Sequence, residues 1–288
     1  MKEKRKLKEL TIKDNFMFGA VMPDEDNCRK LLELVLGMPI ERVTVSKEKS
    51  IVYHPEYKGI RLDVYAEDEK HTHYNVEVQV VKKQKLEKRT RYYHSQIDME
   101  LLAGGEEYAK LPDTYVIFIC DFDPFGQGKY RYTFQNVCME DKEMRLKDGS
   151  ISVFLNTCGK NREDISEPLA RFLDFVKADL KESMKDFEDA FILQLQNTVC
   201  KVKSNREMEG RFMVFEEMLK DERAEGKEEG RQEECAENIL LLLRELGNVS
   251  EELTEKIINE TDMSVLRQYL KCAAKAETVE QFMEQIRK

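Results

Sequence analysis

The sequence has no long apolar run and no apolar segment near its start. Its longest uninterrupted apolar stretches, at 115–120 and 239–243, are far shorter than the roughly 20 residues that a membrane-spanning helix needs. The basic N-terminus, MKEKRKLKEL, does not lead into the apolar region of a secretory signal. These absences predict a cytoplasmic protein with no membrane partner.

Paired cysteines and metal-binding histidine patterns are also missing. The seven cysteines are odd in number and widely spread, with no CxxC pair, and the four histidines form no HExxH motif. Such a pattern is typical of free thiols in a reducing compartment, and it excludes a disulfide framework and a structural zinc site.

Charge is plentiful but uneven. Asp and Glu total 57 against 47 Lys and Arg, a net charge of −10, which argues against a protein whose whole surface coats nucleic acid. Residues 216–237 carry ten acids and four bases, whereas residues 82–91 carry six bases and one acid. The acidity therefore belongs mostly to one stretch, and a local basic patch remains.

The apolar spacing predicts an α/β unit followed by helices. A period of 3.6 residues indicates two helices within 11–36, and alternation then indicates strands from 42 to 81. Further along we expect a helix over 85–103, a buried strand over 114–122, a hairpin built from 129–138 and 150–158, and helices after residue 160.

These patterns predict four parts in the chain. Residues 1–160 form the α/β domain, and 161–215 form a helical extension that packs on it. Residues 216–237 form a charged connecting helix or linker, because their two glycines each weaken an exposed helix by about 1 kcal/mol. Residues 238–288 form a small helical region.

Two neighbouring strands carry the residues that could bind a metal or take part in catalysis. Alternation along GIRLDVYAE and YNVEVQVV places Asp63 on one face of the first strand, and Asn75, Glu77 and Gln79 on one face of the second. A hairpin would bring Asp63 next to Glu77, and a bound Mg²⁺ or Mn²⁺ would hold both carboxylates ionised. From spacing alone, such polar residues usually form a solvent face, although Asp is disfavoured in mid-strand.

RLDVYAED followed by YNVEVQV resembles the PD-(D/E)xK nuclease signature, in the form with Gln in place of the usual Lys. Other segments are similar to the recombination-promoting nucleases (Rpn type), also labelled transposases. They are TIKDNFMFGAVM, RTRYYHSQIDMELLAGGEEYAKLPDTYVIFICDFDPF and the charged EGKEEGRQEE. The resemblance covers about residues 8–160 and implies a restriction-endonuclease-like core, a mixed sheet flanked by helices, followed by an all-helical C-terminal region.

The resemblance also implies roles for particular residues. Asp63 and Glu77 would bind the catalytic Mg²⁺ or Mn²⁺, and Gln79 would orient the attacking water without the positive charge of the motif lysine. Asp14 matches an acidic position that completes the metal site in the family, with helix capping as the alternative. Leu62 stands where the motif has Pro, and Met17 stands where family members often have Lys.

The basic run after Gln79 is a candidate DNA contact, because lysine and arginine bind phosphates without reading sequence. A solvated helix end is the alternative. Tyr93 and Gln96 are further candidates for orienting the scissile phosphate, although tyrosines at helical spacing are also typical of a core edge. The candidate cations are Lys82, Lys83, Lys85, Lys88, Arg89 and Arg91.

We therefore expect a metal-dependent DNA endonuclease linked to recombination or mobile elements. Two alternatives remain open. One is a DNA-binding protein that retains the nuclease fold but cleaves poorly, because the motif lysine is missing. The other is an interaction protein whose C-terminal helices, within 206–288, drive homo-oligomerisation.

Overall fold

The computed structural model describes residues 5–46, 49–51, 58–82 and 85–286. The chain forms two compact units, Met1–Phe212 and Met213–Lys288. None of the helices in the described part of the chain is long and apolar enough to cross a membrane. The finer division into four parts stays a prediction.

Two helices open the first unit after a 3₁₀ turn at Leu7–Glu9. Helix α1 spans Asn15–Val21, and α2 spans Glu25–Leu36. Asp24 caps α2 by accepting a hydrogen bond from the Asn27 backbone, and Gly37 ends it in a left-handed conformation with φ 72°. Because an L side chain is strained at that φ, glycine suits this end of the helix. The two helices predicted within 11–36 are therefore confirmed.

A mixed six-stranded sheet forms the centre of the unit, in the order β1-β4-β5-β6-β8-β7. Strands β5, β6 and β8 pair in parallel, and the outer pairs are antiparallel. The predicted helix, buried strand and hairpin correspond to α3 (Leu86–Leu101), β6 and the β7–β8 pair. The strands are β1 Val43–Ser46, β4 Val64–Asp68, β5 His73–Gln79, β6 Thr114–Cys120, β7 Arg131–Phe134 and β8 Ser150–Asn156.

One predicted strand is divided in two. The sequence pattern indicates a continuous strand over 59–67, but the structure has β3 at Ile60–Arg61 and β4 from Val64, with a bend at Asp63 between them. Strand β3 pairs with β2, Ser50–Ile51, in a separate two-stranded sheet. The bend lets Leu62 and Tyr65 join one core cluster, which strict alternation would not allow.

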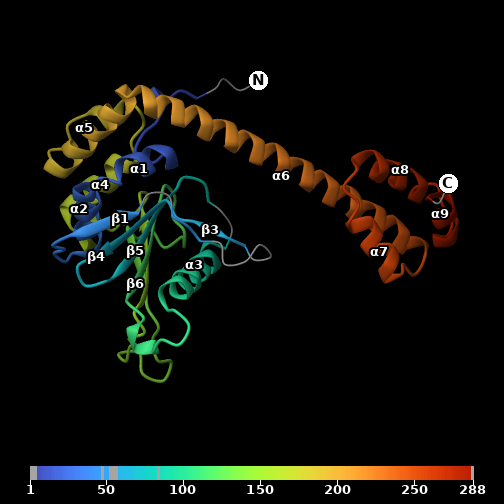
Figure 1. The fold of residues 1–288 in the computed structure, drawn as a ribbon, viewed down its shortest axis with the longest axis horizontal. Helices are drawn as coiled ribbons and strands as arrows, with labels where there is room; N and C mark the ends of the chain where they lie inside the picture. The colour runs from blue at the N-terminus through green and yellow to red at the C-terminus, as the bar shows by residue number, and fades with distance from the viewer. Residues whose placement is uncertain (1–4, 47–48, 52–57, 83–84, 287–288) are drawn as a thin grey trace. The chain divides into compact units, whose positions relative to one another are not determined.

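Helices cover the sheet on its two sides (Figure 1). Helix α3, Leu86–Leu101, packs on one face, where Tyr93, Phe118 and Phe154 form part of a buried aromatic core. On the other side gather α1, α2, α4 (Glu167–Lys177) and α5 (Ala190–Ser204). Short 3₁₀ turns complete the unit at Tyr108–Lys110, Arg162–Asp164 and Glu182–Met184.

Helix α6, Arg206–Leu246, runs without a break through the charged stretch 216–237. At its start, the ring of Phe212 packs edge-on against Phe16, with centroids 5.1 Å apart. Of the two alternatives that the sequence allows for this stretch, a helix and a partly ordered linker, the structure has a helix that includes Gly226 and Gly230.

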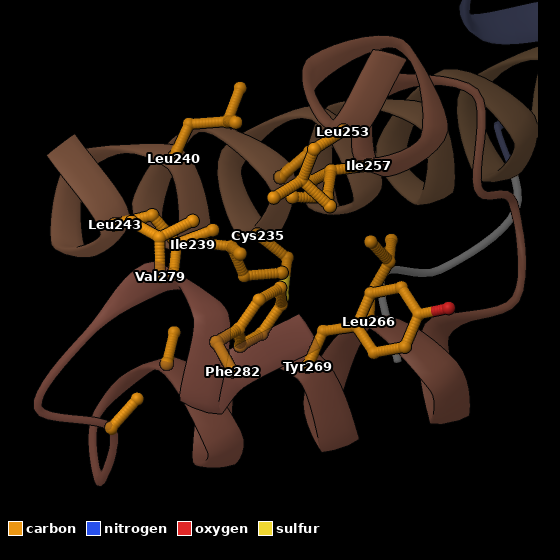
Figure 2. Close-up of a cluster of buried hydrophobic side chains, with 13 residues drawn as sticks. Cys235, Ile239, Leu240, Leu243, Leu253, Ile257, Leu266, Tyr269, Val279 and Phe282 are labelled. Atoms are coloured by element: carbon orange, nitrogen blue, oxygen red, sulfur yellow. The ribbon is translucent and has the colours of Figure 1, made fainter. Parts of the chain in front are cut away.

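The second unit has its own core. Three short helices, α7 Glu251–Ile258, α8 Met263–Ala273 and α9 Val279–Ile286, pack with the C-terminal part of α6. Figure 2 shows Phe282 directed toward Cys235 on α6, and the ring of Tyr269 packs edge-on against Phe282. Ile239, Leu243 and Phe282 are fully buried, so these helices bury a common apolar face.

Candidate active site

Asp63 lies at the bend between β3 and β4, one residue before the paired part of β4. Val64 lies opposite Val76 in the antiparallel ladder with β5, so the same register continued by one residue brings Asp63 across from Glu77. The negative charge of Asp63 contributes to raising the pKa of both Glu77 and Arg89, in agreement with this register.

Glu77 stands in the middle of β5, where every residue is buried, and it is 1% exposed. Its side chain shares a face of the sheet with Phe118, against helix α3. Nη2 of Arg89 donates to Oε2 at 2.5 Å, and Nδ2 of Asn75 donates to Oε1 at 3.4 Å. A carboxylate is thus held inside the protein by a cation from α3 and an amide from its own strand.

The electrostatics of this site favour an additional positive charge. Burial, and then the charge of Asp63, raise the pKa of Glu77 well above its usual range, while Arg89 acts in the opposite direction. Burial alone would lower the pKa of Arg89, but Glu77 and Tyr93 outweigh it and the pKa is raised. Two carboxylates beside one guanidinium leave a net demand for a cation.

The residues present fit a divalent cation of the Mg²⁺ class. Asp63 and Glu77 supply hard oxygen donors, and Oδ1 of Asn75 is buried and accepts no hydrogen bond from any described residue. No set of three or more His, Cys, Asp or Glu side chains within the described residues is placed to hold a metal. Mg²⁺ is commonly held by one or two carboxylates together with waters and substrate phosphates, so a pair is sufficient.

Asp14 is not brought into this pair. It is the N-cap residue of α1, and its two carboxylate oxygens accept hydrogen bonds from elsewhere in the N-terminal segment. Nη2 of Arg5 donates to Oδ1 at 2.6 Å, and the backbone N–H of Thr11 donates to Oδ2 at 2.7 Å. The side chain therefore holds the segment before α1 in place through these hydrogen bonds. Its role as a metal ligand stays a prediction.

Gln79 is the last residue of β5 and lies on the same face as Glu77. It is buried, and its side-chain amide forms no hydrogen bond with any residue the structure describes. Its backbone carbonyl accepts a hydrogen bond from Asp121, which follows β6. The amide beside Glu77 is therefore available to a bound molecule.

The predicted phosphate contacts divide into two groups. Lys82, Lys85, Lys88 and Arg91 are exposed, and none of them forms an ion pair with another described residue. Arg89 is instead half-buried against Glu77 and donates from Nε to the hydroxyl of Tyr93 at 2.7 Å. Lys83 lies outside the described residues.

A pocket of about 300 Å³ opens beside the exposed cations. Lys82 and Lys85 contribute to its wall together with Phe122 and Phe125 from the segment that follows β6. Basic and aromatic side chains thus meet next to the end of β5.

Tyr93 and Gln96 both face the interior. Tyr93 stacks on Phe118, and its hydroxyl lies 3.5 Å from Oε2 of Glu77, while Gln96 is 7% exposed. Tyr93 is therefore a core residue that also borders the carboxylate. A role of Tyr93 or Gln96 in orienting a phosphate stays a prediction.

Asp121 and Asp123 have structural partners. Asp121 pairs with Nζ of Lys13 at 2.8 Å and accepts a hydrogen bond from the hydroxyl of Thr157. Asp123 accepts from the backbone N–H groups of Phe125, Gly126 and Gly128 and from the hydroxyl of Tyr132. These carboxylates shape the turn after β6.

Sequence reasoning missed the ion pair between Arg89 and Glu77 and expected Arg89 only on DNA. A signal was present, because Arg89 and Tyr93 are four residues apart on the helix that directly follows β5. Helix α3 must return over the face of the sheet that carries Glu77, so that side of the helix meets the carboxylate.

Comparison with models of known protein families gives a match. The family model described as PD-(D/E)XK nuclease family transposase matches residues 12–239, which include the sheet, helices α1 to α5 and most of α6. No curated protein and no solved structure matches the chain.

Proposed function

The chain belongs to the PD-(D/E)XK nuclease family transposases, and from this membership we propose that it is a metal-dependent endonuclease that hydrolyses phosphodiester bonds of DNA. The family associates the chain with nuclease activity and mobile elements. DNA breakage during recombination is the cellular role that follows.

The observation that carries the proposal is the carboxylate pair on adjacent strands. The register of Val64 with Val76 brings Asp63 across from Glu77, and the charge of Asp63 helps to raise the pKa of the buried Glu77. Two neighbouring buried carboxylates are unfavourable when no cation is bound between them. It is favourable where a divalent cation neutralises both groups.

Asp63 and Glu77 would hold Mg²⁺ or Mn²⁺, which supplies neutralising charge for the phosphate and increases the acidity of water when bound. Gln79 has an amide that can orient the attacking water, since its oxygen accepts and its nitrogen donates hydrogen bonds. The water oxygen forms a bond to phosphorus, one ester bond breaks, and the leaving oxygen takes up a proton. A neutral amide contributes orientation without charge.

The DNA backbone would lie along the exposed cations next to the site. Lys82, Lys85, Lys88 and Arg91 surround the start of α3, which directly follows the strand that carries Glu77 and Gln79. Because phosphate contacts position DNA without reading sequence, this patch supports a nuclease with little base preference of its own.

Plasmid nicking tests the proposal. Purified protein is incubated with supercoiled DNA in Mg²⁺, in Mn²⁺ and in EDTA, together with Asp63→Asn and Glu77→Ala. Metal-dependent conversion to nicked or linear DNA by the wild type, lost in both variants, is expected. Equal activity of wild type and Glu77→Ala would remove the assignment of the catalytic site.

A second candidate function is DNA binding with weak cleavage, and the neutral Gln79 is the observation that favours it. The binding affinity for duplex DNA, measured by fluorescence anisotropy, separates the two candidates. Tight binding with no metal-dependent nicking would favour the binding protein. Gln79→Lys would then be expected to restore cleavage, because it returns the motif lysine to its strand.

A further inference from the structure

Arg89 occupies a constrained position beside the carboxylate pair. Its Nη2 donates to Glu77, its Nε donates to the Tyr93 hydroxyl, and its guanidinium carbon lies 4.9 Å from the ring centroid of Tyr93 and 5.6 Å from that of Phe118. Contacts on two edges and over two rings fix the plane of the guanidinium. The cation is therefore preorganised, in contrast to the exposed lysines around it.

The guanidinium keeps donors that the protein does not use. An arginine side chain has five N–H groups, and the contacts with Glu77 and Tyr93 engage two nitrogens. Nη1 forms no hydrogen bond with any described residue, and the side chain is 29% exposed. Arg89 can consequently hold Glu77 on one edge while it donates to a phosphate oxygen from another.

The chemistry of the site requires such a cation. Attack on a phosphodiester increases negative charge on the phosphate oxygens, and preorganised donors that meet this charge lower the barrier. Strand β5 offers the neutral Gln79 at the place of the motif lysine, so its own residues supply no positive charge there. Among the described residues, Arg89 is the cation that contacts Glu77.

We propose that Arg89 supplies from helix α3 the positive charge that the motif lysine would supply from β5, donating to the phosphate through its unengaged N–H groups while it holds Glu77. This inference rests on the proposed nuclease function. It assigns Arg89 to the reacting phosphate rather than to the DNA backbone at large.

The test is a charge-relocation series measured by steady-state cleavage kinetics: Arg89→Gln, Arg89→Lys, Gln79→Lys, and the double variant Arg89→Gln with Gln79→Lys. Arg89→Gln is expected to lower kcat about 10²–10³-fold with little change in KM, as for loss of one preorganised donor. Arg89→Lys keeps the charge and should remain within about tenfold of wild type. Lys110→Gln, which removes an exposed cation paired with Glu106, is the matched control.

The double variant gives the decisive result. A lysine at position 79 should recover at least about tenfold of the kcat lost in Arg89→Gln, because it returns positive charge to the same phosphate. If Arg89 only stabilised α3 or the Tyr93 ring, a lysine on β5 would restore nothing. Absence of recovery, or an unchanged kcat in Arg89→Gln, would overturn the proposal.

A measurement without catalysis separates phosphate contact from metal binding. The Mg²⁺-dependent rise in Tm is expected to persist in Arg89→Gln, since Asp63 and Glu77 remain. Loss of that rise would show that Arg89 acts through the metal ligands, and would contradict the proposal. Inactive wild-type protein would instead reject the nuclease function itself, so the two failures are distinguishable.

Discussion

Val64 on β4 lies directly opposite Val76 on β5, and this pairing places the bend at Asp63 across from Glu77. A shift of the register by one residue would send either carboxylate to the opposite face of the sheet. The two buried valines lie on the face away from α3, so their packing maintains the register on which the carboxylate pair depends.

Replacement of Glu77 by Gln is expected to stabilise the metal-free protein at neutral and alkaline pH. The folded-state pKa of Glu77 is raised, so its contribution to stability is present at low pH and is lost as pH rises from about 4.5 through the raised value. The wild type should therefore lose stability across this window, and Glu77→Gln should lose less. Urea unfolding in EDTA between about pH 5 and pH 8 measures the difference.

The control for Glu77→Gln on β5 is Glu100→Gln on helix α3, at a side chain that is 46% exposed. It should follow the wild type at every pH. Addition of Mg²⁺ should reverse the order, stabilising the wild type and leaving Glu77→Gln unchanged. A parallel pH dependence of wild type and Glu77→Gln would contradict the electrostatic description of the site.

Asp63→Asn and Asp14→Asn are expected to differ in their response to metal. Mg²⁺ should raise the Tm of the wild type, since a ligand at about 100 times its Kd stabilises a protein by about 2.7 kcal/mol. Asp63→Asn should lose this rise. Asp14→Asn should keep it, because both Asp14 oxygens already bind Arg5 and Thr11. Loss of the rise in Asp14→Asn would show that Asp14 completes the metal site.

His94 is expected to make the protein sensitive to acid. Its two ring nitrogens lie 2.9 Å from the Thr114 hydroxyl and 3.0 Å from the Ser152 hydroxyl, and burial lowers its pKa to about 4. The unfolded chain takes up a proton near pH 6.5, so stability present above that pH is lost as pH falls toward 4. The loss should reach up to about 3 kcal/mol.

His94→Gln tests this contribution. Its free energy of unfolding should fall less than that of the wild type between about pH 6.5 and pH 4, whatever its absolute stability. His71→Gln, at a side chain that is 81% exposed, is the matched control and should retain the wild-type slope. A slope that His94→Gln leaves intact would assign the acid sensitivity to other groups.

Binding of duplex DNA should depend on salt through the exposed cations of α3 and the preceding segment. Removal of one cation that neutralises a phosphate should reduce the slope of log K against log salt by about 0.9. Combined replacement of Lys82, Lys85, Lys88 and Arg91 by Gln should therefore flatten the slope. The control is Lys181→Gln, at an exposed lysine before the Glu182–Met184 turn, which should leave the slope unchanged. Fluorescence anisotropy in EDTA measures binding without cleavage. An unchanged slope would place the DNA on another surface.

The fold was predictable because its periodic signals are strong. The alternation along YNVEVQV and the apolar run of β6 correspond to central strands, and Asp24 and Gly37 bound α2 as capping chemistry predicts. The bend at Asp63 was not predictable, since the residues on both sides of it still alternate. There the tertiary pairing of β3 with β2 overrides the local pattern.

The candidate site was predictable in part for a related reason. The proximity of Asp63 and Glu77 can be predicted from the alternation of side chains along two strands of one hairpin. The contact of Arg89 with Glu77 joins a helix to a strand, and its geometry depends on how α3 crosses the sheet. The periodicity of the sequence does not predict how α3 crosses the sheet. From the sequence, Arg89 therefore could not be distinguished from the other basic residues of the run, which all indicate a DNA contact.

Removal of the C-terminal unit should change the oligomeric state, if its helices drive assembly. A chain that ends after Phe212 keeps the contact of that ring with Phe16, whereas a chain that ends near residue 205 would expose Phe16 and weaken the first unit. Light scattering should give a lower number of subunits for the 1–212 chain than for the full protein. Leu243→Ala in the full chain, expected to destabilise the second core by about 2–5 kcal/mol, should act in the same direction. An equal number of subunits in all three would locate any assembly in the first unit.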